Sequence, residues 1–147
     1  MKRIWILRRL KNMNMSVPFM IDVYIKEVRS LLEQAVPAWN GGLTQIQIHA
    51  IERVQKAALY IILDKNYTNY EAACSITGLE PLDIRREEIC LNFARKNLKS
   101  SDCLFIKANQ RVDPRRKNDK VKEYFCRTKR FENSSIPYLA KLLNQYS

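Results

Sequence analysis

The stretch IERVQKAALYIIL, residues 51–63, decides the fold class because its apolar side chains recur at helical spacing. An α-helix turns about 100° per residue, so positions three and four apart share one face. The residues that fall together in this way are Ile51, Val54, Ala58, Ile61 and Ile62. The spacing therefore predicts an amphipathic helix whose apolar face packs into a core.

The opposite side of this helix carries a narrow stripe of rings and cations. It consists of His49, Arg53, Lys56 and Tyr60. Such a stripe is typical either of a solvated surface or of a contact with nucleic acid. The helix taken alone leaves both interpretations open.

The rest of the chain is also rich in helical signals. Apolar periodicity predicts helices over residues 3–12, 16–36, 45–64, 69–76 and 82–99, and a last one built on Leu139, Leu142 and Leu143. Capping boxes are expected at Thr44 with Gln47 and at Thr68 with Glu71, and Gly78 suits a left-handed position after a helix. Residues 124–131 alternate and predict an extended segment.

These elements predict a mainly α fold, a bundle of about five to six helices with a short extended segment near the C-terminus. The expected division is a helical domain at residues 1–99, followed by a basic extension at residues 100–147 that ends in a helix.

The charge of the chain is strongly positive and unevenly placed. It has 26 Lys and Arg against 15 Asp and Glu, a net charge of +11. Ten of the cations and only three of the anions lie between Lys107 and Arg130. Such a balance predicts attraction to polyanions, chiefly nucleic acid, and this segment is the one expected to face phosphates.

Several other classes of function find no support in the residues. The four cysteines are widely spaced and there is one histidine, so neither a zinc site nor a Cys–His catalytic pair is expected. No carboxylate motif for catalytic metal ions and no phosphate-binding glycine loop occurs, and no cofactor is expected. No apolar run is long enough for a signal peptide or a membrane span, which predicts an intracellular protein, in cytoplasm or nucleus.

One residue of the predicted helix 82–99 is anomalous. Arg86 falls between Cys90 and Phe93 on the apolar arc, and a charge there is seldom buried without a partner. We expect a structural ion pair between Arg86 and Glu52 of the preceding long helix. Cys90 itself is expected to be a small core residue rather than a reactive thiol.

Five collinear blocks resemble a known family: WILRRLK (5–11), DVYIKEVRSLLEQAVPAWNGGLT (22–44), IERVQKAALYIIL (51–63), DIRREEICLNFARK (83–96) and CRTKRFENSSIPYLAKLLN (126–144). They are similar to the C-terminal, thumb and post-palm region of LINE-type (non-LTR) retrotransposon reverse transcriptases, closest to jockey-like elements. The sequence departs from the family pattern at Gln34, Val36 and Tyr60.

The resemblance implies a non-catalytic part of an RNA-directed DNA polymerase. The family's catalytic palm, with its (F/Y)-x-D-D motif, would lie upstream of Met1, so this chain is not expected to be an enzyme on its own. The implied partners are RNA and DNA, as template–primer, and the upstream palm domain. Thumb-like helices would hold the duplex by its backbone while the palm performs the chemistry.

Three sets of residues are the expected nucleic-acid contacts, through phosphate neutralisation and, at Tyr60, stacking. The first set is Arg53, Lys56 and Tyr60, the second is Arg8, Arg9 and Lys11, and the third is Arg115, Arg116, Lys117, Arg127, Lys129 and Arg130.

Three alternatives remain open. One is a helix-turn-helix DNA reader with residues 81–99 as its recognition helix, although apolar residues occupy much of that helix's circumference. Another is a helical protein-interaction module without any polymerase role. The third is an inert relic of an element.

Overall fold

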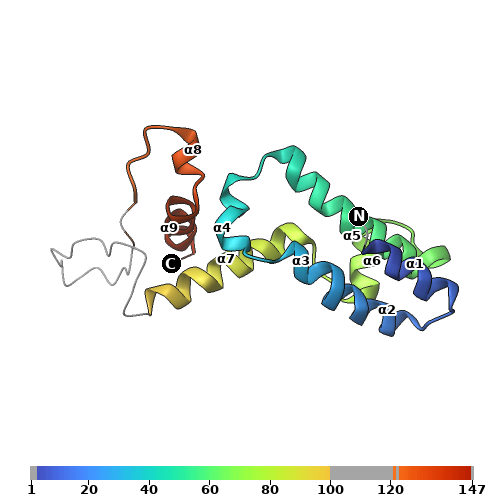
Figure 1. The fold of residues 1–147 in the computed structure, drawn as a ribbon. Helices are drawn as coiled ribbons and strands as arrows, with labels where there is room; N and C mark the ends of the chain where they lie inside the picture. Colours follow the sequence, from blue (N-terminus) through green and yellow to red (C-terminus); the bar gives the residue numbers. More distant parts are fainter. Residues whose placement is uncertain (1–2, 100–120, 122, 147) are drawn as a thin grey trace. The chain divides into compact units, whose positions relative to one another are not determined.

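The computed structural model describes residues 3–99, 121 and 123–146, and all regular secondary structure in these residues is helical (Figure 1). The described part contains no strand, which confirms the predicted α-helical class. In the same residues, no helix is both long enough and apolar enough to cross a lipid bilayer.

The chain divides into two compact units. Unit 1 comprises Met1–Gln34 and Thr44–Arg85, and unit 2 comprises Ala35–Leu43 and Arg86–Ser147. These bounds do not coincide with the division expected between residues 99 and 100. Each unit is made of two separate stretches of the sequence, so no single boundary residue divides the chain into these units.

Unit 1 begins with α1 (Ile4–Asn12) and a longer helix made of α2 (Val17–Val23), the π-helical turn η1 (Tyr24–Arg29) and α3 (Ser30–Leu32). The predicted helix end near Val36 is wrong by about one turn. Continuing the helix would drive the ring of Pro37 against the carbonyl of Glu33. Instead, Ala35 adopts a left-handed conformation with φ of +54°.

The central helix α5 (Gln45–Leu63) starts at the predicted capping box. Thr44 Oγ1 accepts a hydrogen bond from the Gln47 backbone N–H at 3.4 Å, and Gln47 Oε1 accepts one from the Thr44 N–H at 2.9 Å. The short turn η3 (Asp64–Asn66) follows. This confirms the helix start that the sequence predicts.

Helix α6 (Tyr70–Thr77) begins one residue later than expected, and the Thr68–Glu71 capping box is wrong. Asn69 caps the helix instead, because its Oδ1 accepts a hydrogen bond from the Ala72 N–H at 2.7 Å. Gly78 ends α6 with φ of +66°, as predicted. Helix α7 (Leu82–Leu98) follows, beginning in unit 1 and continuing in unit 2.

The core of unit 1 is built around α5, on which α1, α2 and α6 pack (Figure 1). Leu7, Tyr24, Leu59 and Ile62 are completely buried there. These side chains come from three separate helical stretches, α1, η1 and α5, and α5 is the element against which the other helices pack.

Unit 2 contains α4 (Val36–Trp39), the turn η2 (Asn40–Gly42), most of α7, α8 (Lys129–Glu132) and α9 (Ser135–Gln145). The predicted last helix is confirmed by α9. The core of unit 2 includes Val36, Cys90, Leu139 and Leu143. The expectation that Cys90 is a core residue is likewise confirmed.

The predicted extended segment at residues 124–131 is wrong at its C-terminal end. Residues 129–132 form α8, and Thr128 Oγ1 accepts a hydrogen bond from the Phe131 N–H at 3.3 Å. Phe125 is 88% exposed and Phe131 is also exposed, so the alternation does not mark a buried face. The local side-chain cap at Thr128 favours a helical turn here.

Candidate nucleic-acid interface

The predicted polar stripe of α5 lies on the molecular surface. His49, Arg53, Lys56 and Tyr60 are all exposed, whereas Val54, Ala58, Leu59 and Ile62 on the other side are buried. The amphipathic division predicted from the spacing is therefore confirmed. The rigid core beneath the stripe holds its side chains at fixed intervals along one helix.

The residues of this stripe differ in how many contacts they make with other side chains of the protein. Lys56 Nζ lies 4.9 Å from the ring centre of Tyr70, and Tyr60 meets Tyr67 edge to face at 5.5 Å. Arg53 makes no hydrogen bond or ion pair within the described part of the chain. Arg53 is thus the member most available to a phosphate.

The second predicted set lies on α1, which packs directly against α5. Arg8 and Arg9 are exposed; the Arg9 guanidinium lies 4.8 Å from the ring centre of Trp5. Lys11 forms an ion pair with Asp64, with Nζ and Oδ2 3.5 Å apart. The structure thus brings α1 and α5 together, but Lys11 has a carboxylate partner there.

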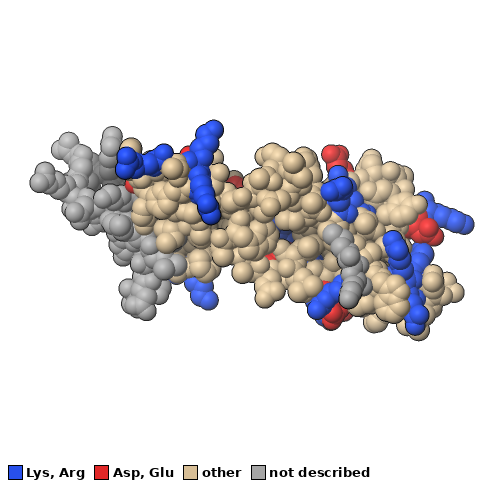
Figure 2. Space-filling model, turned by 45° about the horizontal axis from the view of Figure 1, so that its top comes forward, with Lys and Arg blue, Asp and Glu red and all other residues tan. Residues whose placement is uncertain are grey.

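Part of the third predicted set can be placed, and it belongs to unit 2. Arg127, Lys129 and Arg130 are exposed around the start of α8. Arg115, Arg116 and Lys117 lie outside the described residues. On the face seen in Figure 2, Lys and Arg side chains occur in separate groups, some with acidic side chains beside them.

The two units differ widely in charge. Unit 1 has 11 Lys and Arg against 8 Asp and Glu, whereas unit 2 has 15 against 7. Most of the excess positive charge of the chain therefore belongs to unit 2. The α5 stripe is part of a unit that is close to neutral.

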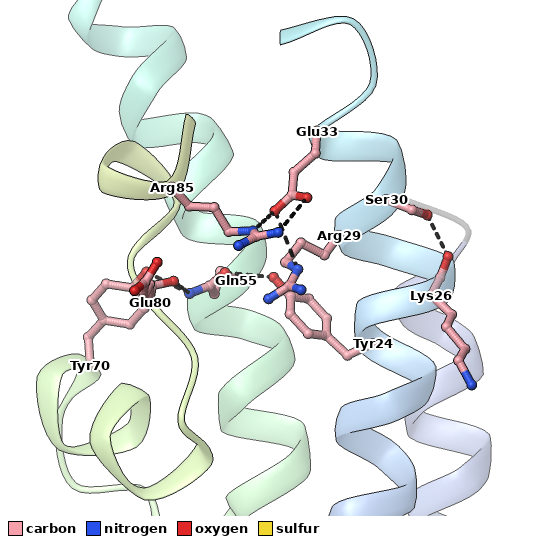
Figure 3. A network of polar contacts seen from close by, with 9 residues as sticks. All are labelled: Tyr24, Lys26, Arg29, Ser30, Glu33, Gln55, Tyr70, Glu80 and Arg85. Atoms are coloured by element: carbon pink, nitrogen blue, oxygen red, sulfur yellow. Dashed lines mark hydrogen bonds and ion pairs between the residues drawn. The ribbon is translucent and has the colours of Figure 1, made fainter. Parts of the chain in front are cut away.

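A buried polar network crosses the core of unit 1, and the sequence interpretation missed it (Figure 3). Gln55 is completely buried and accepts a hydrogen bond from the Tyr24 hydroxyl at 2.8 Å. Its Nε2 donates to the Tyr70 hydroxyl at 3.1 Å and to the Glu80 carbonyl at 2.9 Å. One amide thereby joins η1, α5, α6 and the segment before α7.

Glu52 extends this network to the start of α7. Its carboxylate accepts a hydrogen bond from the Tyr70 hydroxyl at 2.6 Å and another from the Asp83 backbone N–H at 2.8 Å. Burial, with the Glu52 contact added for Tyr70, raises the pKa of both Tyr24 and Tyr70 well above the usual tyrosine value. Both phenols therefore remain protonated donors at physiological pH.

A second polar cluster in unit 1 joins η1, α3 and α7. Glu33 pairs with Arg29, with Nε and Oε1 3.3 Å apart, and it also accepts a hydrogen bond from Arg85 Nε (Figure 3). All three side chains are largely withdrawn from solvent. These arginines hold helices together and are poor candidates for phosphate contacts.

Arg86 and Glu52 belong to different units, and their expected ion pair stays a prediction. Arg86 is only 2% exposed, and within the described residues its Nε and Nη1 have no hydrogen-bond partner. Burial of the side chain was expected from its position on the apolar arc. The missing acceptors are a separate finding.

The described residues hold no group of three or more His, Cys, Asp or Glu side chains that could bind a metal ion. Cys74 and Cys90 are buried, and burial raises the pKa of Cys90 to about 11. A thiol with that pKa is almost entirely protonated near neutral pH and is a weak nucleophile. Its environment is that of a packing residue.

Comparisons with known proteins find no significant match to this chain. No protein-family model matches the sequence, no curated protein is significantly similar to it, and no solved structure matches its fold.

Proposed function

We propose that this chain is a nucleic-acid-binding, non-catalytic part of a reverse transcriptase of the LINE type, holding a template–primer duplex through phosphate contacts. The observation that carries the proposal is the exposed position of Arg53 and Arg8 on two helices that pack against each other. Neither side chain has an ion pair or hydrogen bond among the described residues, so both guanidiniums are available to phosphate oxygens.

The chemistry of such a contact is electrostatic. Each phosphate that a Lys or Arg neutralises releases a condensed counterion, so affinity falls steeply as salt rises. The positive excess of unit 2 and the exposed Arg127, Lys129 and Arg130 support the same interpretation. The role of these residues is to hold the polymer; the bond-forming chemistry belongs to a palm domain in the proposed parent protein.

A salt titration tests the proposal directly. Binding of a fluorescent RNA–DNA duplex, followed by anisotropy, should weaken steeply with salt in the wild-type protein. In the double variant Arg8→Gln/Arg53→Gln, the slope of log affinity against log salt should shrink by roughly one to two, because each contact contributes about 0.9. Lys65→Gln, which removes an exposed cation of η3 outside the three sets, should leave the slope unchanged.

Two outcomes would contradict the proposal. One is the absence of duplex binding at low salt; the other is an equal loss in Lys65→Gln and in the double variant. If neutralising both the α1 and α5 cations and the Arg127–Arg130 cluster left every detectable association unchanged, a protein-interaction module would be the better interpretation.

The helix-turn-helix alternative has one observation in its favour, because α6, the turn at Gly78 and α7 follow one another as that motif requires. The exposed side chains at the start of α7 include Asp83 and Glu88, while Arg85 is occupied by Glu33. Carboxylates at the N-terminal end of a recognition helix would repel the phosphates that flank a groove. A strong sequence preference in a randomised-oligonucleotide selection would support this alternative instead.

A further inference from the structure

Helix α1 concentrates the positive charge of unit 1. It contains Arg8, Arg9 and Lys11 and no acidic residue, while the remainder of unit 1 has eight Lys and Arg against eight Asp and Glu. The net charge of the unit is therefore equal to the charge of this one helix. Any polyanion that approaches unit 1 is attracted mainly to α1.

The outer face of α1 combines this charge with an exposed indole. Trp5, Arg8, Arg9 and Asn12 stand three, four and seven positions apart, so they share one side of the helix, and all four are exposed. Ile4 and Leu7 are buried on the other side, in the core of unit 1. The packing of α1 thus leaves a ring, two guanidiniums and an amide side by side in solvent.

The exposure of Trp5 is informative because the apolar surface of a tryptophan normally contributes to a core or an interface. The other tryptophan, Trp39, is half-buried and packs against the core of unit 2. Trp5 is 56% exposed, and the Arg9 guanidinium lies 4.8 Å from the centre of its ring. Tyr60 on α5, by comparison, has Tyr67 against it.

An aromatic ring beside planar cations is the combination that binds an unpaired nucleotide. A free base stacks on the aromatic ring while neighbouring phosphates pair with the guanidiniums. In a duplex the faces of the bases are covered by their neighbours, so a duplex offers the phosphates without the stacking surface. The arrangement on α1 therefore favours single strands.

We propose that the outer face of α1 is a single-strand contact, in which an unpaired base stacks on Trp5 and the adjacent phosphates pair with Arg8 and Arg9. This inference rests on the proposed function, of which it specifies one subsite: phosphates of either polymer pair with the arginines of α1 and α5, and stacking on Trp5 adds a contact for an unpaired template or primer nucleotide alone. Arg9 has two roles here, because it also supports the indole from one side.

Tryptophan fluorescence tests the contact in the full-length protein. In Trp39→Phe, Trp5 is the single tryptophan. Oligothymidylate should quench its emission to the extent that the strand binds, with binding followed in parallel by the anisotropy of a labelled strand. Trp5→Ala should weaken binding of the single strand about tenfold, since stacking contributes about 1–3 kcal/mol per base. Binding of an RNA–DNA duplex should change less than twofold, and Trp5→Tyr should restore most of the single-strand affinity.

Matched variants separate stacking from simple loss of apolar surface or charge. Ile46→Ala removes an exposed apolar side chain from the start of α5 and should leave single-strand affinity unchanged. Arg9→Lys keeps the charge and removes the planar group, so it should lower single-strand affinity more than duplex affinity. Circular dichroism confirms that each variant remains folded.

Four results would overturn the inference. Salt-dependent binding of both polymers without any change in Trp5 emission would leave the proposed function standing and remove the stacking contact. Equal quenching by heparin, which has no bases, would show that Trp5 responds to charge alone. A response to anionic phospholipid vesicles but not to oligothymidylate would assign the face to a membrane surface. Absence of binding to any nucleic acid would defeat the inference and the proposed function together.

Discussion

The two units of this chain bury polar groups in opposite ways. Unit 1 contains Gln55, whose amide has partners on three sides, so its buried polarity is almost fully satisfied. Unit 2 buries Arg86, of which two guanidinium nitrogens have no acceptor among the described residues. A satisfied network specifies one arrangement of helices, whereas an unsatisfied charge lowers stability.

The two units also differ in net charge. Unit 1 is close to neutral apart from α1, and unit 2 carries most of the excess of Lys and Arg. The total of +11 therefore describes neither unit. Composition identifies a class of ligand, and the positions of the charged residues decide which part of the chain would bind it.

The largest expected effect concerns the network of unit 1. Gln55→Leu should lower the free energy of unfolding by about 2–4 kcal/mol, because it leaves the buried Tyr24 hydroxyl without an acceptor and removes the hydrogen bonds to the Tyr70 hydroxyl and the Glu80 carbonyl. Urea denaturation followed by circular dichroism measures the change. Gln45→Leu, at an exposed position of the same helix, should have an effect within about 0.5 kcal/mol.

Hydrogen exchange then locates the Gln55 effect. Faster exchange should appear in α5 and α6 while amides of α9 keep their protection. Equal acceleration in both units would show that they unfold as one cooperative body, and the comparison between them would no longer hold.

In unit 2 the most sensitive contact is the approach of η2 to α9. A Cβ on Gly41 would lie 2.6 Å from Tyr138 Cγ and 2.8 Å from the Asn133 carbonyl oxygen, closer than packed atoms tolerate. Gly41→Ala should therefore destabilise the protein by about 1–3 kcal/mol, measured by thermal denaturation. The matched variant Gly42→Ala meets its nearest atom at 3.8 Å and should have a much smaller effect.

The region that Gly41→Ala destabilises should differ from the region that Gln55→Leu destabilises. Gly41→Ala should accelerate hydrogen exchange in α9, where Ser135 Oγ donates to the Pro37 carbonyl at 2.7 Å and Asn40 donates to the Tyr138 hydroxyl at 3.1 Å. Protection in α5 should be retained. If Gly42→Ala were as damaging as Gly41→Ala, the close approach would not be the cause.

Local signals in the sequence predicted much of the helical structure. The amphipathic spacing of α5, the Thr44 capping box and the left-handed Gly78 depend on residues within a turn or two of one another. Such interactions can be evaluated without knowledge of the fold. The errors at Thr68 and near Val36 arose where two adjacent local signals competed, an asparagine cap in one place and a proline in the other.

Long-range pairing could not be predicted in the same way. Gln55 stands between Ile51 and Ala58 on the buried arc of α5, a signal that could have suggested a buried amide, but its partners Tyr24 and Glu80 are distant in sequence. Gly41 and Gly42 have the same turn propensity, and only the approach of Tyr138 distinguishes them. The exposure of Trp5 also depends on which face α1 turns to the core.

The smallest expected effect tests the buried charge of unit 2. Arg86→Met retains the apolar stem and removes the guanidinium whose Nε and Nη1 lack acceptors, so the free energy of unfolding should rise by about 1 kcal/mol. Arg85→Met is the matched control; it breaks the contact with Glu33 and should lower stability by a similar amount. Thermal denaturation of both variants measures these opposite changes in stability.

The expected ion pair between Arg86 and Glu52 predicts the reverse order of stability. Arg86→Met would then be the more damaging change, because loss of the guanidinium would leave the Glu52 carboxylate unpaired. The sign of a single shift in melting temperature therefore decides whether Arg86 is a buried charge without compensation or half of an ion pair.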